Sequence, residues 1–206
     1  MTAIDWMPWQ LDALDLAASS SLDISTPRQN GKSTIAREVA RRAALRGENV
    51  LYLTDGRRLA LDALHHIEVM QRDSDPSLIR RVIRGYPDRQ IHIGAGSITF
   101  CSYRSERGPD NQDRVICDAT PELAPEDTLI VTTGPLLRVG VQLERGLPRT
   151  EMIRYGMDRD DDPASEETWR KANPAIDTVI PIDTMRVLFD ALTLDRFKAD
   201  CLNAPR

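Results

Sequence analysis

The chain has 206 residues, 41% of them hydrophobic and 29% charged, so it is long enough and apolar enough to fold around a sizeable core. Its formal net charge of −5 argues against a protein that coats nucleic acid through bulk charge, although a few loops could still contact DNA. No apolar run approaches the roughly 20 residues that a membrane span needs, and we expect no signal peptide. The three cysteines are far apart, which favours a reducing compartment without disulfides.

Strand and helix patterns alternate from the start of the chain. A strand is predicted over 21–26, and apolar residues at helical spacing predict a helix over 32–47 that stops near Gly47. A second strand follows over 49–56 and a second helix over 57–72. This alternation is typical of α/β domains.

Later strands complete the predicted sheet. Residues 89–103 alternate around Gly94-Ala95-Gly96, which suits a hairpin. The compact apolar runs at 113–118 and 128–134 are typical of strands buried in a central parallel sheet. The order predicts a three-layer α/β domain with a central, mainly parallel sheet, which we assign to residues 1–156.

The composition changes after about residue 156, and we assign 157–206 to a second segment that packs on the core. The acidic run Asp158, Asp160, Asp161, Asp162 is interpreted as a solvated linker, because consecutive carboxylates in a loop repel one another. A helix is predicted over 164–172, with Ser165 as its cap and Glu167 near its start. Residues 181–204 are expected to form two short helices.

The stretch STPRQNGKST, residues 25–34, contains the end of a phosphate-binding loop. Such loops read G-x-x-x-x-G-K-[ST], and here Thr26 stands where the first glycine normally is. A predicted strand precedes the loop and a helix follows it, so backbone N–H groups and the helix dipole would face an anion. Gly31 would let the backbone approach phosphates, Lys32 would reach them, and the Ser33 hydroxyl would bind Mg²⁺. The alternative is a polar turn with a solvated lysine.

Two further strand ends are consistent with a nucleotide site. Asp118 ends the apolar run RVICD, where an ATPase of this kind holds its magnesium ion. Thr132 and Thr133 end the run TLIVTT and could sense the γ-phosphate. The alternatives are that Asp118 caps the next turn and that the threonines only fill a strand.

Five segments occur in the same order as in the large terminase subunits of tailed bacteriophages: MPWQ, PRQNGKS, RSERGPDNQDRVICD, TTGP and WRKANPAI. The chain resembles that family from Trp6 to about Asn203. WRKANPAI is the least generic segment, because no general nucleotide chemistry requires it. The resemblance implies a P-loop NTPase fold of the RecA or ASCE type with a small helical C-terminal segment. It also implies ATP and Mg²⁺ as cofactors, in a motor that packages double-stranded DNA into a procapsid.

The resemblance also implies site residues and partners. Gln10 would read the adenine base with Trp9 beside it, the alternative being a core aromatic with a surface glutamine. The family's loop often lacks its first glycine and carries an arginine, here Arg28, as a phosphate or switch contact. The nucleotide-binding loop would comprise Arg28, Gln29, Asn30, Gly31, Lys32, Ser33 and Thr34, with Thr133 nearby. The implied partners are the small terminase subunit, the portal and procapsid, and further copies in a ring, all in the host cytoplasm and without a membrane.

Two departures from the family set limits on activity. Ala119 follows Asp118 where the family has a glutamate that positions the attacking water, and Glu122 could approach only if its turn folds back. The connection 119–127 is also short for the helix that the family has there. With Lys32, Asp118 and Glu122 as catalytic candidates, we expect impaired hydrolysis. We expect no nuclease activity, because the family's nuclease domain would begin where this chain stops.

Two other functions fit the same residues. One is a non-catalytic nucleotide-binding or assembly module, or a prophage remnant, that has lost hydrolysis through Ala119. The other is an unrelated P-loop ATPase such as a helicase-like protein, for which WRKANPAI has no explanation.

Overall fold

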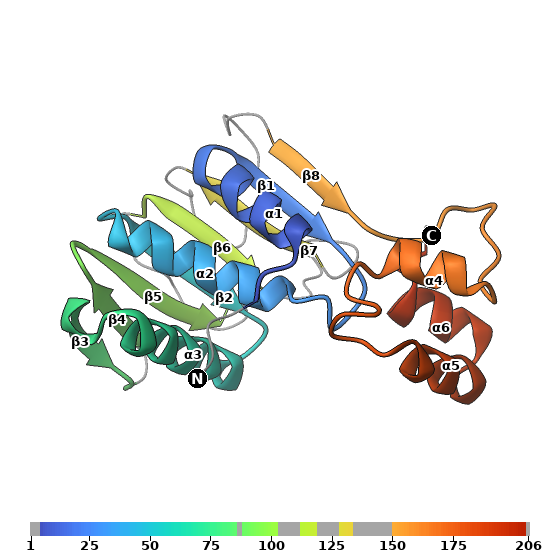
Figure 1. Cartoon of the computed structure of the whole chain (residues 1–206). Coiled ribbons are helices and arrows are strands. Elements are labelled where there is room, and N and C mark those ends of the chain that lie inside the picture. Colours follow the sequence, from blue (N-terminus) through green and yellow to red (C-terminus); the bar gives the residue numbers. More distant parts are fainter. Residues whose placement is uncertain (1–4, 86–87, 103–111, 119–127, 134–149, 205–206) are drawn as a thin grey trace.

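The computed structural model describes residues 5–85, 88–102, 112–118, 128–133 and 150–204. Within these ranges, eight strands form one sheet in the order β3-β4-β5-β2-β6-β7-β1-β8 (Figure 1). The strands are β1 (Ser21–Ser25), β2 (Asn49–Thr54), β3 (Ile79–Ile83), β4 (Gln90–Ile93), β5 (Gly96–Ser102), β6 (Arg114–Asp118), β7 (Thr128–Thr133) and β8 (Thr150–Arg154). Among the helices of the same ranges, none is long and apolar enough to span a membrane.

The sheet is mixed, and most of its strands point the same way. β2 is parallel to β5 and β6, and β1 is parallel to β8. β4 is antiparallel to β3 and β5, and β7 is antiparallel to β6 and β1. Only β4 and β7 among the described strands therefore oppose the rest, which confirms a mainly parallel sheet. The β4–β5 pair confirms the hairpin predicted over 89–103.

The direction of β7 corrects one expectation. The apolar run 128–134 was predicted to lie parallel in the sheet, but β7 runs antiparallel to both of its neighbours. Residues 119–127 are all that separates β6 from β7 in the sequence. A crossover between parallel neighbours takes a dozen or more residues, so this short connection favours an antiparallel pair.

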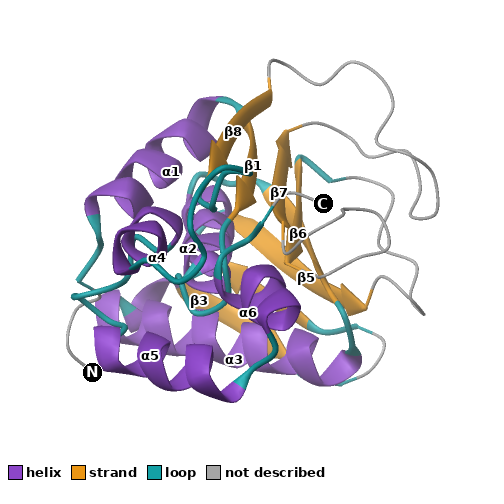
Figure 2. Ribbon diagram, turned by 90° about the vertical axis from the view of Figure 1, so that its right-hand side faces the viewer, coloured by secondary structure: helices purple, strands orange, loops and turns teal. Residues whose placement is uncertain are grey.

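Three helices cover one face of the sheet: α1 (Pro8–Ser19), α2 (Lys32–Leu45) and α3 (Arg57–Ser74) (Figure 2). Apolar residues of α2, such as Ile35 and Val39, pack there with Tyr52 of the sheet. The opposite face carries a smaller cluster of Leu51, Leu53, Cys101, Val115 and Cys117, as the alternation of side chains along a strand requires. A third layer over that face is not among the described residues. One turn of 3₁₀-helix, η1 (Pro76–Leu78), precedes β3.

Residues 157–204 form a C-terminal helical unit at the carboxyl ends of β1 and β8 (Figure 1). Its helices are α4 (Glu166–Ala172), α5 (Ile182–Ala191) and α6 (Leu194–Cys201), which confirms the three helices predicted for this segment. The unit has its own apolar cluster, in which the rings of Trp169, Phe189 and Phe197 lie 5.1 to 5.6 Å apart. The Ser165 hydroxyl caps α4 by accepting the N–H of Glu167 at 3.2 Å, as predicted.

The acidic run is tied to the helical unit more closely than a free linker would be. The Lys171 ammonium lies 2.7 Å from carboxylate oxygens of both Asp158 and Asp161. These exposed ion pairs contribute little stability individually. Among the described residues, no three histidine, cysteine, aspartate or glutamate side chains are grouped so that they could hold a metal ion.

Candidate nucleotide-binding site

The predicted phosphate loop joins β1 to the start of α2. Gly31 has a φ of 87°, a left-handed conformation that favours glycine. A Cβ atom at this position would also lie 2.5 Å from Gln10 Nε2, so any side chain would displace Gln10. The next residue, Lys32, begins α2, whose first N–H groups have no partner within the helix and can face an anion.

The Lys32 side chain folds back across the loop. Its ammonium donates to the carbonyl oxygens of Thr26 at 2.7 Å and Pro27 at 3.1 Å. The Thr26 hydroxyl lies 3.5 Å from the same ammonium and donates to Pro27 O at 3.1 Å. Threonine in place of the usual glycine therefore adds a contact at the entrance of the loop.

Ser33 and Asp118 meet, as expected if both hold one magnesium ion. The Ser33 hydroxyl donates to Asp118 Oδ1 at 2.9 Å, although 85 residues separate the two in sequence. Asp118 ends β6 and lies opposite Thr54 of β2 in the parallel register. A serine hydroxyl beside a carboxylate provides the oxygen ligands that Mg²⁺ prefers, so these residues fit the ion.

Sequence reasoning missed Tyr52, whose hydroxyl donates to Asp118 Oδ2 at 2.6 Å. Tyr52 is fully buried on β2, and burial, followed by the nearby Asp118 carboxylate, raises the pKa of its hydroxyl well above the ordinary value. The hydroxyl thus keeps its proton and acts as a donor. A tyrosine at an inward-facing strand position was the available signal, since a buried Tyr hydroxyl usually has a hydrogen-bond partner.

Trp9 and Gln10 are both buried at the start of α1. Trp9 is 7% exposed and packs edge-on against Tyr155 with ring centroids 5.5 Å apart, so it is a core aromatic, as in the alternative considered for it. Gln10 accepts the Met7 N–H at 3.1 Å and donates to Asn30 O at 3.3 Å, so it supports the phosphate loop and is not a surface residue. Its contact with adenine stays a prediction.

The remaining loop residues differ in exposure. Arg28 and Gln29 are exposed, and the Arg28 guanidinium lies 4.0 Å from the Asp200 carboxylate of α6. Thr34 is half-buried in the first turn of α2, where its N–H donates to Gly31 O at 3.0 Å. The contact between Arg28 and Asp200 places α6 of the helical unit beside the loop.

Asn30 is completely buried and joins the loop to the segment WRKANPAI. Its amide nitrogen donates to Asn173 Oδ1 at 3.0 Å, and its amide oxygen accepts the Ala175 N–H at 3.2 Å. The sequence singled out this segment only through a family resemblance. The structure brings it against the phosphate loop, which no local pattern predicts.

The structure does not bring Thr132 and Thr133 to the loop, and it corrects their expected role at the γ-phosphate. Because β7 is antiparallel, the backbone of Thr133 lies beside Arg114 at the far end of β6, while Asp118 lies beside Leu129. Four residues of strand separate these positions, or roughly 13 Å. The other two predicted positions of this region, Ala119 and Glu122, are outside the described residues.

Comparison with known proteins gives a likeness of fold. No family model and no curated protein matches the chain. The crystal structure of the HK97 bacteriophage large terminase superposes with a TM-score of 0.71 at 15% sequence identity. The match covers 98% of this chain and 51% of that one, so the chain spans about half the length of that terminase. The chain is therefore an α/β domain that shares the fold of about half of the HK97 bacteriophage large terminase.

Proposed function

We propose that this chain is the ATP-binding motor domain of a phage terminase large subunit, which powers the packaging of duplex DNA into a procapsid. The observation that carries the proposal is the meeting of Ser33 with Asp118 beside a loop that contains Gly31 and Lys32. The likeness to the HK97 large terminase favours a packaging motor over other P-loop ATPases. The partners that follow are double-stranded DNA, a small terminase subunit, a portal and procapsid, and further copies of the chain in a ring. The expected setting is the host cytoplasm.

Each residue of the site would have a defined task. The start of α2 and the Lys32 ammonium would bind the phosphates of ATP, and Lys32 would exchange its contacts with Thr26 and Pro27 for phosphate oxygens. Ser33 and Asp118 would hold Mg²⁺, which neutralises phosphate charge when bound. Titration with a non-hydrolysable ATP analogue, with and without Mg²⁺, tests the proposal, and absence of Mg²⁺-dependent binding would contradict it.

A second function, a non-catalytic nucleotide-binding or assembly module, is favoured by one specific residue. Ala119 has no group that could orient a water molecule, although it directly follows Asp118. Both functions require nucleotide binding, and only the motor requires turnover. Phosphate release measured beside nucleotide titration separates them.

Replacing Tyr52 with phenylalanine is expected to weaken Mg²⁺-dependent nucleotide binding by about tenfold. The change removes one hydrogen bond to the Asp118 carboxylate, worth about 1.5 kcal/mol, while the ring stays in the core. Binding without Mg²⁺ should not change. Titrations at several Mg²⁺ concentrations provide the measurement, with Tyr155→Phe, which alters the tyrosine beside Trp9, as the control. An unaltered Mg²⁺ dependence in Tyr52→Phe would show that Tyr52 does not orient Asp118.

If Gln10 reads the base, the chain should bind ATP more tightly than GTP, and Gln10→Ala should reduce this preference. A site built to hydrogen-bond one base leaves polar groups unpaired against another. Gln10 also donates a hydrogen bond to Asn30 O and packs on Gly31. Loss of its side chain should therefore weaken the binding of both ATP and GTP. The ratio of the two dissociation constants is therefore the quantity to measure. An equal ratio in wild type and variant would leave Gln10 with the supporting role alone.

A further inference from the structure

The C-terminal helical unit contacts the phosphate loop through buried amide groups. We infer that Asn173 is a positioning residue of the nucleotide site, which holds the phosphate loop in its binding conformation through Asn30. The inference rests on the proposed function in taking the ligand to be a nucleotide. It gives WRKANPAI a physical role that nucleotide chemistry alone does not supply.

The hydrogen bond between Asn30 and Asn173 bridges the loop and the helical unit. Asn30 is completely buried in the loop. Its amide nitrogen lies 3.2 Å from the carbonyl oxygens of Pro27 and Arg28 and 3.0 Å from Asn173 Oδ1. Its amide oxygen accepts the N–H of Ala175 at 3.2 Å. Both ends of the Asn30 amide are thus engaged, and each end has a partner in the segment WRKANPAI.

Asn173 is itself held by the helical unit. It is 2% exposed, and its amide nitrogen donates to Trp169 O at 3.1 Å and Cys201 O at 2.8 Å. These carbonyls belong to α4 and to the last residue of α6, which pack together through the rings of Trp169 and Phe197. The Asn173 oxygen is therefore presented to the loop from a packed surface.

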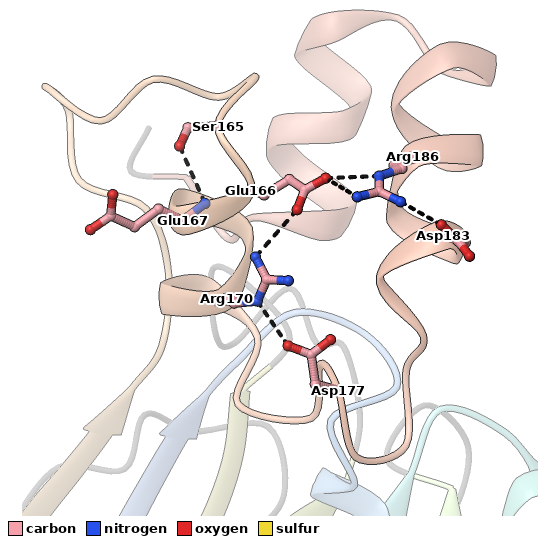
Figure 3. A network of polar contacts seen from close by, with 7 residues as sticks. All are labelled: Ser165, Glu166, Glu167, Arg170, Asp177, Asp183 and Arg186. Carbon is pink, nitrogen blue, oxygen red and sulfur yellow. Dashed lines mark hydrogen bonds and ion pairs between the residues drawn. The ribbon is translucent and has the colours of Figure 1, made fainter.

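A polar network keeps the surrounding turn in place (Figure 3). The Arg170 guanidinium of α4 donates to Asp177 at 2.8 Å, and the Arg186 guanidinium of α5 donates to Glu166 at 2.7 Å. These contacts join α4, α5 and the turn that carries Asn173. Exposed pairs contribute little stability individually, so their effect is mainly to restrict the position of the turn.

The loop needs such support because its backbone is strained. Gln29 has a φ of 65°, a left-handed conformation that residues other than glycine rarely adopt. Such a conformation persists only where the surroundings fix it. Here the Asn30 amide holds the carbonyl oxygens of Pro27 and Arg28, the two residues that precede Gln29. Pro27 O also accepts the Lys32 ammonium, so a displaced loop would move the lysine that binds phosphate.

The chain offers a matched control in Asn203. This buried asparagine also joins the helical unit to the sheet domain, but its amide donates to Ser25 Oγ at 2.9 Å and Tyr155 O at 2.8 Å. Ser25 is the last residue of β1, immediately before Thr26, and Tyr155 directly follows β8, so neither acceptor is bonded to Asn30 or Lys32. Its φ is 46°, so Asn203→Gly removes the side chain without backbone strain.

The experiment measures nucleotide affinity and loop accessibility in the full chain. Asn173→Ala is expected to weaken binding of a non-hydrolysable Mg·ATP analogue about tenfold, because it removes the hydrogen bond that the buried Asn30 amide nitrogen makes to the helical unit. Without nucleotide, native-state trypsin should cleave after the exposed Arg28 several times faster in Asn173→Ala, as mass spectrometry would detect. Asn203→Gly should lower the melting temperature but leave affinity and Arg28 cleavage within twofold of wild type.

Asn30→Ala probes the same bridge from the loop side and keeps the test decisive if Asn173→Ala does not fold. The double variant should bind no more weakly than Asn30→Ala alone, since both residues act through one hydrogen bond. The inference would be overturned if Asn173→Ala and Asn203→Gly changed nucleotide affinity and Arg28 cleavage equally. It would also be overturned if neither variant changed them. Failure of the wild type to bind nucleotide would instead remove the proposed function, and trypsin cleavage after Arg28 would still decide whether Asn173 holds the loop.

Discussion

Replacing Lys32 with alanine is expected to weaken binding of a non-hydrolysable ATP analogue by roughly 100-fold in the presence of Mg²⁺. The ammonium already lies in the loop, held by the carbonyls of Thr26 and Pro27, and the substitution removes the positive charge there. Charge-assisted hydrogen bonds to phosphate contribute about 1.5–3 kcal/mol each, so losing them accounts for a change of this size. Isothermal titration measures it directly.

Lys171→Ala is the matched control for this experiment, because it removes a lysine that pairs with Asp158 and Asp161 in the helical unit. It should leave the affinity unchanged. Lys32→Ala also removes hydrogen bonds within the loop, so a melting curve must accompany the titration. Unchanged affinity for the ATP analogue in a folded Lys32→Ala variant would contradict the assignment of a phosphate loop.

The isolated chain is expected to bind Mg·ATP but to turn it over very slowly. The proposed function would need a carboxylate after Asp118 to position the attacking water, and the sequence has Ala119 there. Loss of a positioned general base commonly costs about 10²–10⁴ in rate. Ala119→Glu should therefore raise hydrolysis, by about 100-fold at the lower end of that range. Multi-turnover phosphate release is the measurement.

Two variants beside Ala119→Glu make the turnover result interpretable. Glu122→Ala tests the other carboxylate of the 119–127 connection, and Lys32→Ala combined with Ala119→Glu should abolish any activity gained. Brisk wild-type hydrolysis that survives Glu122→Ala would contradict the prediction, because another carboxylate would then position the water. A slow Ala119→Glu variant with normal nucleotide affinity would show that one substitution does not restore the site.

The strand–loop–helix turn at Gly31, the cap of α4 and the strand that ends at Asp118 could be predicted from the sequence because their signals are local. Gly31 and Lys32 have the spacing that a strand–loop–helix turn requires, and the structure shows the left-handed glycine at the start of α2. Ser165 precedes its helix as N-caps do. The sequence also predicted that Ser33 and Asp118 share one ion, because one lies where a helix begins and the other where a strand ends, and the two side chains do meet.

Contacts between distant segments were decided only by the tertiary structure. The Tyr52–Asp118 bond spans 66 residues and the Asn30–Asn173 bond spans 143, and a single hydrogen bond between distant residues has no periodic signature. The direction of β7, which moves Thr133 away from the loop, depends on which neighbours the strand joins. The sequence left two alternatives for Trp9, beside a base or in the core, and only the structure shows that it packs against Tyr155. Composition and spacing set what each segment can form, whereas the register of the sheet and the packing of the helical unit determine which side chains meet.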